Sequence, residues 1–225
     1  MFAIADTCSG LTAFSALKKC MTAVGGQPAP LVDSSRHLLL IGAGGLGLHA
    51  IGWAKLLTDA QVVVAEPDTA KHDAAREAGA DIVVNTSGDD ALELIRAATD
   101  GYGPHAVIDF VGAPATFNLG RTALRNGGTQ VQVGLFGGDL SDIVDLFSDG
   151  NFNTWSPMHK HVMGNGVGTL DELNELFGHV RSGAKKDIPF ETRPIEQANS
   201  AVADLRAGTI VGRCVLTHAP REPSL

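Results

Sequence analysis

Four glycines and one acidic residue form the first pattern in this chain that could support chemistry. The glycines fall within residues 42–47 (GAGGLG), directly after the aliphatic run 38–41. Consecutive aliphatic residues predict a buried strand, and residues 49–57 indicate a helix. A glycine turn between a strand and a helix gathers backbone N–H groups at the positive end of the helix dipole. Such a turn attracts phosphate groups.

Each position in this turn meets a different requirement. Gly42 permits the tight turn, Gly44 lets a pyrophosphate approach the backbone, and Gly47 lets the helix pack closely on the strand. Gly45 and Leu46 lie between them and belong to the same predicted cofactor-binding turn. The alternative is a glycine turn that is purely structural and binds no ligand.

Glu66 ends the next apolar run, residues 61–65. A carboxylate about 20 residues after the glycine turn can accept both hydroxyl protons of an adenosine ribose. The same charge would repel a 2′-phosphate. The sequence therefore predicts a dinucleotide site that prefers NAD over NADP.

Composition narrows the class of protein. A chain of 225 residues with 44% hydrophobic residues can form one large domain, or a domain plus part of another. A formal net charge of −8 argues against nucleic acid or an anionic membrane surface as a partner. No apolar run approaches the length of a membrane span. Three scattered cysteines, Cys8, Cys20 and Cys214, do not form a disulfide framework, and a reducing cytoplasm is the expected compartment.

Strand and helix patterns alternate along most of the chain. Strands are predicted at 38–41, 61–65, 82–84, 105–111, 129–134 and 159–163, and helices at 11–24, 46–57, 68–78, 89–99, 115–125 and 170–180. This alternation predicts an α/β fold, a doubly wound parallel sheet of the Rossmann type with helices on both faces. Ligands bind such sheets at the carboxyl ends of the strands. The residues expected around that crevice are Gly42, Glu66, Phe110, Val111, Gly112, Gly134 and Leu135.

The remaining segments are less regular. Residues 136–157 are interpreted as a loop, and His159 and His161 are expected to share one face of the sixth strand. After Pro189 the pattern changes to a short strand, a helix at about 196–207 and a last strand at 212–217.

Six short motifs follow one another in a family order. They are residues 8–18 (CSGLTAFSALK), 42–47, 66–71 (EPDTAK), 78–81 (AGAD), 107–112 (VIDFVG) and 208–213 (GTIVGR). Together they resemble the zinc-type alcohol dehydrogenases of the medium-chain dehydrogenase/reductase superfamily, over nearly the whole chain.

The resemblance implies three parts. Residues 1–24 would hold the interdomain helix and a remnant of the catalytic domain, 25–188 the NAD-binding domain, and 189–225 the C-terminal piece of a GroES-like catalytic domain. The main body of that catalytic domain would precede Cys8. Apolar surface around Leu11, Phe14 and the segment 189–217 would then lack its usual partner. The implied chemistry is hydride transfer between NAD and an alcohol, aldehyde or ketone, in a homo-oligomer that pairs through strand 159–164.

The resemblance also implies roles for three side chains. Lys71 would be a second ribose partner, Thr12 would place its hydroxyl against the nicotinamide, and Cys8 would be a zinc ligand. The other zinc ligands of the family lie outside this sequence, so a bound zinc ion is a family expectation for which only one candidate ligand is present. Two alternatives stay open, a Thr12 that caps its helix and a Cys8 that is an idle thiol.

Other protein classes fit less well. Short-chain dehydrogenases need a tyrosine four residues before a lysine, but the only tyrosine, Tyr102, is followed at that distance by Ala106. Methyltransferases commonly carry an acidic residue in the first strand, and residues 36–41 contain none. A dinucleotide-binding module without catalytic activity remains an alternative, as does a fragment of a longer zinc-dependent dehydrogenase.

Overall fold

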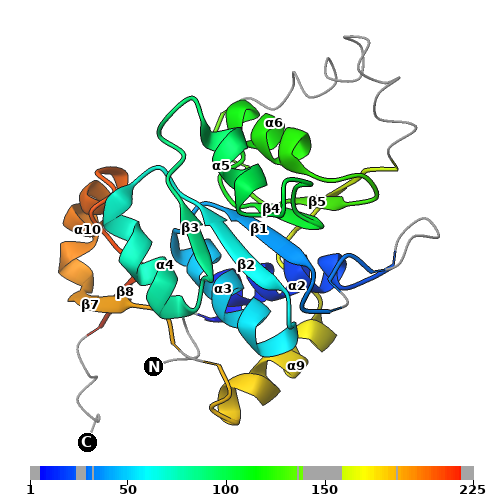
Figure 1. Ribbon diagram of the computed structural model, residues 1–225. Helices are drawn as coiled ribbons and strands as arrows, with labels where there is room; N and C mark the ends of the chain where they lie inside the picture. Colours follow the sequence, from blue (N-terminus) through cyan, green and yellow to red (C-terminus); the bar gives the residue numbers. More distant parts are fainter. Residues whose placement is uncertain are drawn as a thin grey trace, which may run out of the picture.

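The computed structural model describes residues 6–23, 29–31, 33–135, 137–138, 159–185 and 187–218. Most of them belong to one six-stranded sheet with helices on both faces (Figure 1). Every strand pair in this sheet is parallel. The predicted α/β fold with a doubly wound parallel sheet is confirmed.

The strand order across the sheet is β3-β2-β1-β4-β5-β6. The bounds are β1 His37–Ile41, β2 Gln61–Ala65, β3 Ile82–Val84, β4 Ala106–Asp109, β5 Thr129–Gln132 and β6 His161–Gly164. The chain runs outward from β1 to β3 and then crosses back to β4. Ile41 is in register with both Ala65 and Asp109, so the residues after β1, β2 and β4 meet at one edge. The order of the strands reverses between β1 and β4, where ligands bind in open α/β sheets.

Two helical layers cover the sheet. One contains α2 Leu11–Cys20, α3 Gly45–Leu57, α4 His72–Ala78 and α9 Leu170–Arg181, and the other contains α5 Ala91–Ala97 and α6 Pro114–Ala123. Side chains of β1 alternate between the layers, because successive residues of a strand point to opposite faces. Leu38 and Leu40 pack in the first apolar cluster, and Leu39 and Ile41 pack in the second.

Helix α2 is part of the core. A π-helical turn, η1 Asp6–Gly10, leads into it. Leu11 and Phe14 are buried, and the Phe14 ring meets the Trp53 ring edge-on at a centroid distance of 5.1 Å. The expectation of apolar surface without a partner is therefore wrong for these two residues, whereas Val202 and Leu205 of the segment 189–217 are exposed. Helices α3 and α9 cover α2, whereas the sequence pattern alone did not show which element would pack there.

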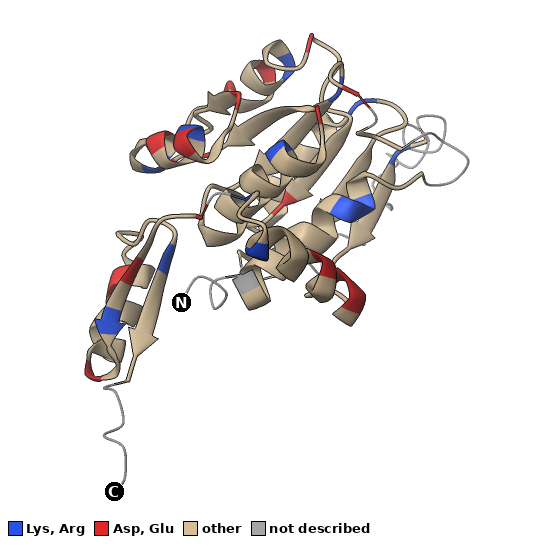
Figure 2. Ribbon diagram, turned by 90° about the horizontal axis from the view of Figure 1, so that it is seen from below, with Lys and Arg blue, Asp and Glu red and all other residues tan. Residues whose placement is uncertain are grey.

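The C-terminal segment forms a small unit of its own. Strands β7 Phe190–Pro194 and β8 Arg213–Thr217 pair in parallel, with η5 Ile195–Gln197 and α10 Ala198–Arg206 between them. The unit projects from one end of the molecule in both views (Figures 1 and 2). A hydrogen bond of 3.1 Å from Arg213 Nε to Ser9 Oγ connects it to the main body.

Several predicted boundaries shift by a few residues. The helix predicted at 68–78 divides into η2 Thr69–Lys71 and α4, with Asp68 as the cap of η2 and Gly79 in the left-handed conformation at the end of α4. The first helix ends at Cys20 instead of residue 24. His159 has a φ of +50° and precedes β6, so it does not share a strand face with His161 as expected. Most of the predicted loop 136–157 lies outside the described residues. No helix in the described ranges is long and apolar enough to span a membrane.

Candidate functional site

A cavity of about 530 Å³ opens at the carboxyl ends of β1, β2 and β4. Its lining residues come from the glycine turn, from the ends of the neighbouring strands and from the C-terminal unit. They include nine of the predicted residues, namely Gly42, Gly44, Gly45, Leu46, Gly47, Glu66, Lys71, Phe110 and Val111. The sheet therefore brings together groups that lie far apart in the sequence.

The glycine turn has the predicted backbone geometry at both of its ends. Gly42 has a φ of +96°, which glycine adopts readily, and its N–H donates to the Ala65 carbonyl at 2.9 Å. A Cβ atom at Gly47 would lie 2.0 Å from the Gly42 carbonyl oxygen. Any larger side chain at Gly47 would push the helix away from the turn.

Gly44 has the opposite environment, because a Cβ atom there would meet no other atom within 4 Å. Gly44 is the N-cap of α3, and no side chain caps this end of the helix. The first amides of a helix lack intrahelical partners and favour anions. The turn therefore opens to the cavity at Gly44, directly before the first residue of α3.

Glu66 is buried at the end of β2 and accepts two backbone hydrogen bonds. Its Oε2 accepts from the Ala43 N–H at 2.7 Å, and its Oε1 accepts from the Asp68 N–H at 3.0 Å. The first bond connects the carboxylate directly to the glycine turn. Each carboxylate oxygen has a second lone pair, so the group can still accept from hydroxyls in the cavity.

Lys71 lines the same cavity as Glu66. Its Nζ lies 3.3 Å from Asp68 Oδ2, an ion pair between partly exposed groups. The backbone N–H of Ala70 and the Lys71 ammonium hold the pKa of Asp68 below its usual value. The lining of the cavity thus includes both a carboxylate, that of Glu66, and an ammonium group, that of Lys71.

Apolar side chains form another wall of the cavity. The members are Ile41, Phe110, Val111, Ala115 and Leu119. They come from the end of β1 and from the segment between β4 and the middle of α6. This wall suits a flat apolar group such as a nucleobase.

Arg213 is a cavity residue that the sequence analysis did not assign. It begins β8, and a Cβ atom at Gly45 would lie 2.5 Å from its Nε, so the guanidinium rests on the glycine turn. Burial is the main cause that lowers the pKa of Arg213. An arginine on the last strand gives no local sign that it will reach a turn near the start of the sheet. The contact appears only in the folded chain.

Asp109 organises the neighbouring loop from a fully buried position at the end of β4. Its Oδ1 accepts from the N–H groups of Val111 and Gly112 at 2.8 and 3.1 Å. Its Oδ2 accepts from Thr116 Oγ1 and Gln132 Nε2 at 2.9 and 3.1 Å. The sequence alone does not indicate this role, because an aspartate after an apolar run also fits a simple turn.

Three predicted cofactor-binding residues lie beside the described cavity and do not line it: Gly112, Gly134 and Leu135. A Cβ atom at Gly112 would lie 2.1 Å from the Gly134 carbonyl, so these glycines let two loops touch. Leu135 is 65% exposed. In this part of the crevice the small residues serve loop packing.

Thr12 and Cys8 also lie outside the cavity lining among the described residues. The Thr12 hydroxyl donates to the Cys8 carbonyl at 2.7 Å, and the Thr12 carbonyl accepts from Asn165 Nδ2 at 3.1 Å. Gly10, not Thr12, is the N-cap of α2, so the alternative role of Thr12 as a cap is wrong. Cys8 is exposed.

Comparison with known proteins decides the family. The sequence profile of the zinc-binding dehydrogenases matches residues 45–180. The chain belongs to this family. The NAD-dependent alcohol dehydrogenases of Sulfurisphaera tokodaii and Saccharolobus solfataricus are each 33% identical to it over 211 residues, 93% of this chain and 56% of theirs. The predicted resemblance to zinc-type alcohol dehydrogenases is confirmed.

Solved structures of similar proteins agree with this assignment. An alcohol dehydrogenase from Aeropyrum pernix matches with a TM-score of 0.82 and 26% identity, covering 96% of this chain and 57% of that one. An acetophenone reductase from Geotrichum candidum, solved in complex with NAD, matches with a TM-score of 0.71 and 26% identity over 96% of this chain and 55% of that one. This zinc-binding dehydrogenase chain spans about half the length of the curated relatives it matches.

The family name raises the question of a metal site. Catalytic zinc takes three protein ligands. No group of three or more histidine, cysteine or acidic side chains that could hold a metal ion occurs in the described ranges of this zinc-binding dehydrogenase chain. Cys8 by itself does not fit a zinc site, and zinc enters none of the steps proposed below.

Proposed function

We propose that this chain is the NAD(H)-binding part of a zinc-type alcohol dehydrogenase. One observation carries the proposal. The carboxylate of Glu66 lies in the same cavity as the unobstructed turn at Gly44, and it accepts a hydrogen bond from the residue between Gly42 and Gly44. This pairing of an anion-binding turn with an acidic group suits the phosphates and the ribose of one dinucleotide. Relatives named as NAD-dependent alcohol dehydrogenases support it.

The proposed binding mode uses three parts of the cavity. The pyrophosphate lies on the amides at the start of α3, and Arg213 supplies a positive charge above it. The hydroxyl groups of the adenosine ribose donate hydrogen bonds to the Glu66 carboxylate, and Lys71 is the second partner of the ribose. The adenine lies against the apolar wall formed by Ile41, Leu119 and their neighbours.

The nicotinamide end of the ligand extends past Arg213. Arg213 donates to Ser9, Ser9 follows Cys8 in the chain, and the Thr12 hydroxyl donates to the Cys8 carbonyl. We propose that Thr12 contacts the nicotinamide there and that Gly112, Gly134 and Leu135 border its path. When bound, NAD accepts a hydride from an alcohol carbon, or NADH returns one to an aldehyde or ketone. The protein holds and orients the ring.

The organisation of the chain supports further parts of the proposal. The separate sheet of β7 and β8 fits the division into 1–24, 25–188 and 189–225 that the sequence predicts. Strand β6 ends the larger sheet in the described residues, and we propose that a homo-oligomer forms through it. All three cysteines are free, which fits a cytoplasmic location. The chain by itself then acts as a dinucleotide-binding module whose alcohol chemistry needs additional zinc ligands.

The test is a calorimetric titration of the chain with NADH and NADPH. We expect NADH to bind at least about tenfold more tightly, a difference of roughly 1.4 kcal/mol. The Glu66→Gln variant should reduce this preference, because its neutral amide no longer repels the 2′-phosphate. Glu77→Gln, on the same segment but outside the cavity lining, is the matched control. Equal affinities for the two cofactors in the parent chain would contradict the proposal.

A further inference from the structure

A second polar pocket of about 220 Å³ lies at the opposite edge of the sheet, where β1, β4 and β5 begin. Its lining includes two arginines, Arg36 and Arg125, together with His105 and the turn residues Asn126, Gly127 and Gly128. None of the described lining residues is acidic, although the chain as a whole carries a formal charge of −8. Because this edge carries the amino ends of the strands, the pocket is separate from the proposed NAD site.

Backbone hydrogen bonds fix the framework of this pocket. The Arg125 N–H donates to the Pro104 carbonyl at 3.1 Å, and the Gly128 N–H donates back to the Arg125 carbonyl at 3.1 Å. The Arg36 carbonyl accepts from the Gln61 N–H at 2.8 Å at the start of the sheet. Both arginines therefore extend from anchored positions.

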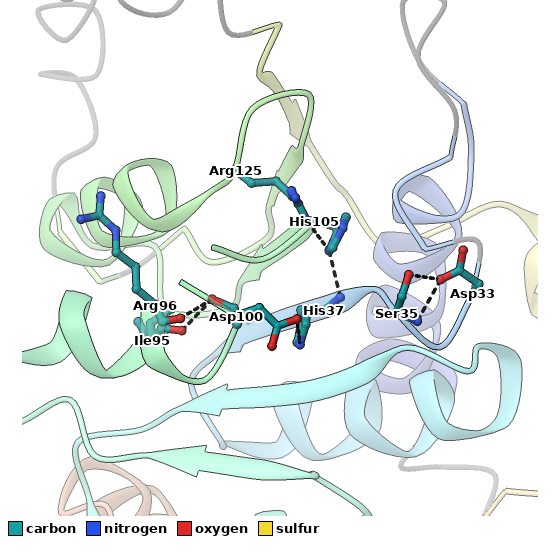
Figure 3. Close-up of polar contacts among 9 residues, drawn as sticks. Asp33, Ser35, His37, Ile95, Arg96, Asp100, His105 and Arg125 are labelled. Carbon is teal, nitrogen blue, oxygen red and sulfur yellow. Dashed lines mark hydrogen bonds and ion pairs between the residues drawn. The ribbon is translucent and has the colours of Figure 1, made fainter. Parts of the chain in front are cut away.

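The hydrogen bonding of His105 shows which groups the pocket offers. The buried imidazole lies between the start of β1 and Arg125, and its Nδ1 accepts from the His37 N–H at 3.0 Å (Figure 3). A neutral imidazole with an accepting Nδ1 carries its proton on Nε2. The Arg125 guanidinium contacts that Nε2, so one N–H donor faces another.

The neutral imidazole of His105 cannot by itself remove this contact between two N–H donors. In the neutral ring only Nδ1 can accept, and it already accepts from the His37 N–H at 3.0 Å, while Arg125 lies 3.3 Å from Nδ1 and also contacts Nε2. Two stacked rings, those of His37 and His105, lie 5.9 Å apart at an angle of 13° and hold the orientation. Burial and the charges of Arg125 and Arg36 lower the pKa of His105 to about 4, so the ring is neutral near pH 7. Arg125 and the Nε2–H therefore both lack a suitable acceptor in their mutual contact.

Arg36 adds a third donor. Its Nε is buried and has no hydrogen-bond partner among the described residues. Asp33 Oδ2 lies 3.7 Å away, within range of an ion pair but too far for a hydrogen bond. Asp33 instead accepts two hydrogen bonds from Ser35 through Oδ1 (Figure 3). The pocket is thus surrounded by donors that need an acceptor.

We propose that this pocket binds a small tetrahedral oxyanion of the phosphate class, held by Arg36, Arg125 and the Nε2–H of His105. A phosphate group has acceptor oxygens in several directions, and arginine pairs with it through two parallel hydrogen bonds. One oxygen between Arg125 and His105 would replace the contact between two donors. The size of the pocket suits inorganic phosphate or the phosphate group of a small metabolite.

The test is a calorimetric titration of the full chain with inorganic phosphate at constant ionic strength, after saturation with NADH. We expect saturable binding that is at least about tenfold weaker in Arg125→Gln and also weaker in Arg36→Gln. Arg76→Gln removes an equal charge on exposed α4 and should bind phosphate like the parent. Absence of saturable binding, or an equal loss in Arg76→Gln, overturns the proposal.

A second measurement does not depend on the folding of the variants or on NADH binding. Nitrogen NMR of the parent chain should show a protonated Nε2 and an unprotonated Nδ1 in His105, and phosphate should shift the Nε2 signal. An unmoved His105 signal overturns the proposal even if NADH binds normally. The same titration with acetate and with glycerol phosphate tests the class of anion. If inorganic phosphate or glycerol phosphate binds more tightly than acetate, the phosphate class is supported. If acetate binds as tightly as both phosphate compounds, the proposal is contradicted.

Discussion

Two glycines in the same turn should respond differently to substitution. At Gly44 the backbone has a φ of −75° and the space beyond it is open, so a side chain fits the protein. Gly44→Val should keep the melting temperature of the chain but lose NADH binding by at least about tenfold, because the branched side chain takes the place of the pyrophosphate. Thermal unfolding and an NADH titration check the two halves of this prediction.

Gly47 provides the comparison for that experiment. Gly47→Ala would place a methyl group 2.0 Å from the Gly42 carbonyl, where the helix contacts its own turn. We expect this variant to lose about 2 kcal/mol or more of unfolding free energy. If Gly44→Val is destabilised as much as Gly47→Ala, the turn is only structural.

His105 should make the stability of the chain depend on pH. Its pKa is lowered to about 4 by burial and by Arg125, Arg36 and His37, while Asp33 acts in the opposite direction. The unfolded chain, with a histidine pKa near 6.5, then binds more protons than the folded chain between these values. Unfolding free energy should therefore fall as the pH decreases from about 6.5 towards 4.

The measurement is urea unfolding at several pH values in a buffer without phosphate. Carboxylates titrate at the lower end of the same range, so the informative quantity is the difference between the parent and His105→Gln. The variant should show a smaller slope, whereas His218→Gln, at an exposed position, should match the parent. Identical slopes in all three chains would contradict the prediction.

Local requirements explain which residues of the candidate site could be placed at the cavity from the sequence. The glycine turn and Glu66 were found because each follows a strand at a spacing that the backbone itself requires. Arg213 and Asp109 could not be assigned in this way, because their roles depend on contacts with groups that are distant in the sequence. Gly112 and Gly134 were correctly placed at the carboxyl edge, but a sequence cannot distinguish a glycine that faces a ligand from one that lets two loops touch.

Among the elements, the strands that contain a run of β-branched residues, β2 and β3, were predicted more accurately than the strand β6 at the other end of the sheet. Both strands were predicted at their observed bounds, because each contains three consecutive β-branched residues. The polar start of β6 gave no comparable pattern, and His159 was included in the strand. The burial of α2 was missed because the apolar character of Phe14 does not identify its partner, Trp53.

Strand β6 should support association between copies of the chain. It pairs with β5 on one side and ends the sheet in the described residues, and an uncovered strand edge can pair with another chain. Light scattering at micromolar concentration should give a mass of a dimer or larger oligomer. Val162→Lys, which adds a charge to this exposed strand, should shift the mass towards the monomer, whereas Val202→Lys on α10 should not. A monomer mass for the parent chain would contradict the prediction.

At the scale of the whole molecule, we expect the chain to bind its cofactor without turning over alcohols. The cavity provides the groups that a dinucleotide requires, whereas the described residues provide one candidate zinc ligand at Cys8. We expect the chain to bind NADH but to form little or no NADH from NAD and simple primary or secondary alcohols. Elemental analysis should find zinc well below one ion per chain. Stoichiometric zinc with steady turnover would show that the chain holds a site beyond the groups identified here.

The position of Arg213 on the last strand has a consequence for the order of events during synthesis. The side chains around the cavity extend in sequence from Ile41 to Arg213, so a growing polypeptide contains the glycine turn and Glu66 long before it contains the arginine. Domains begin to fold as the chain emerges from the ribosome. A nascent chain can therefore form the central strands early. The complete phosphate-binding surface exists only after β8 has emerged and Arg213 has packed against the start of α3.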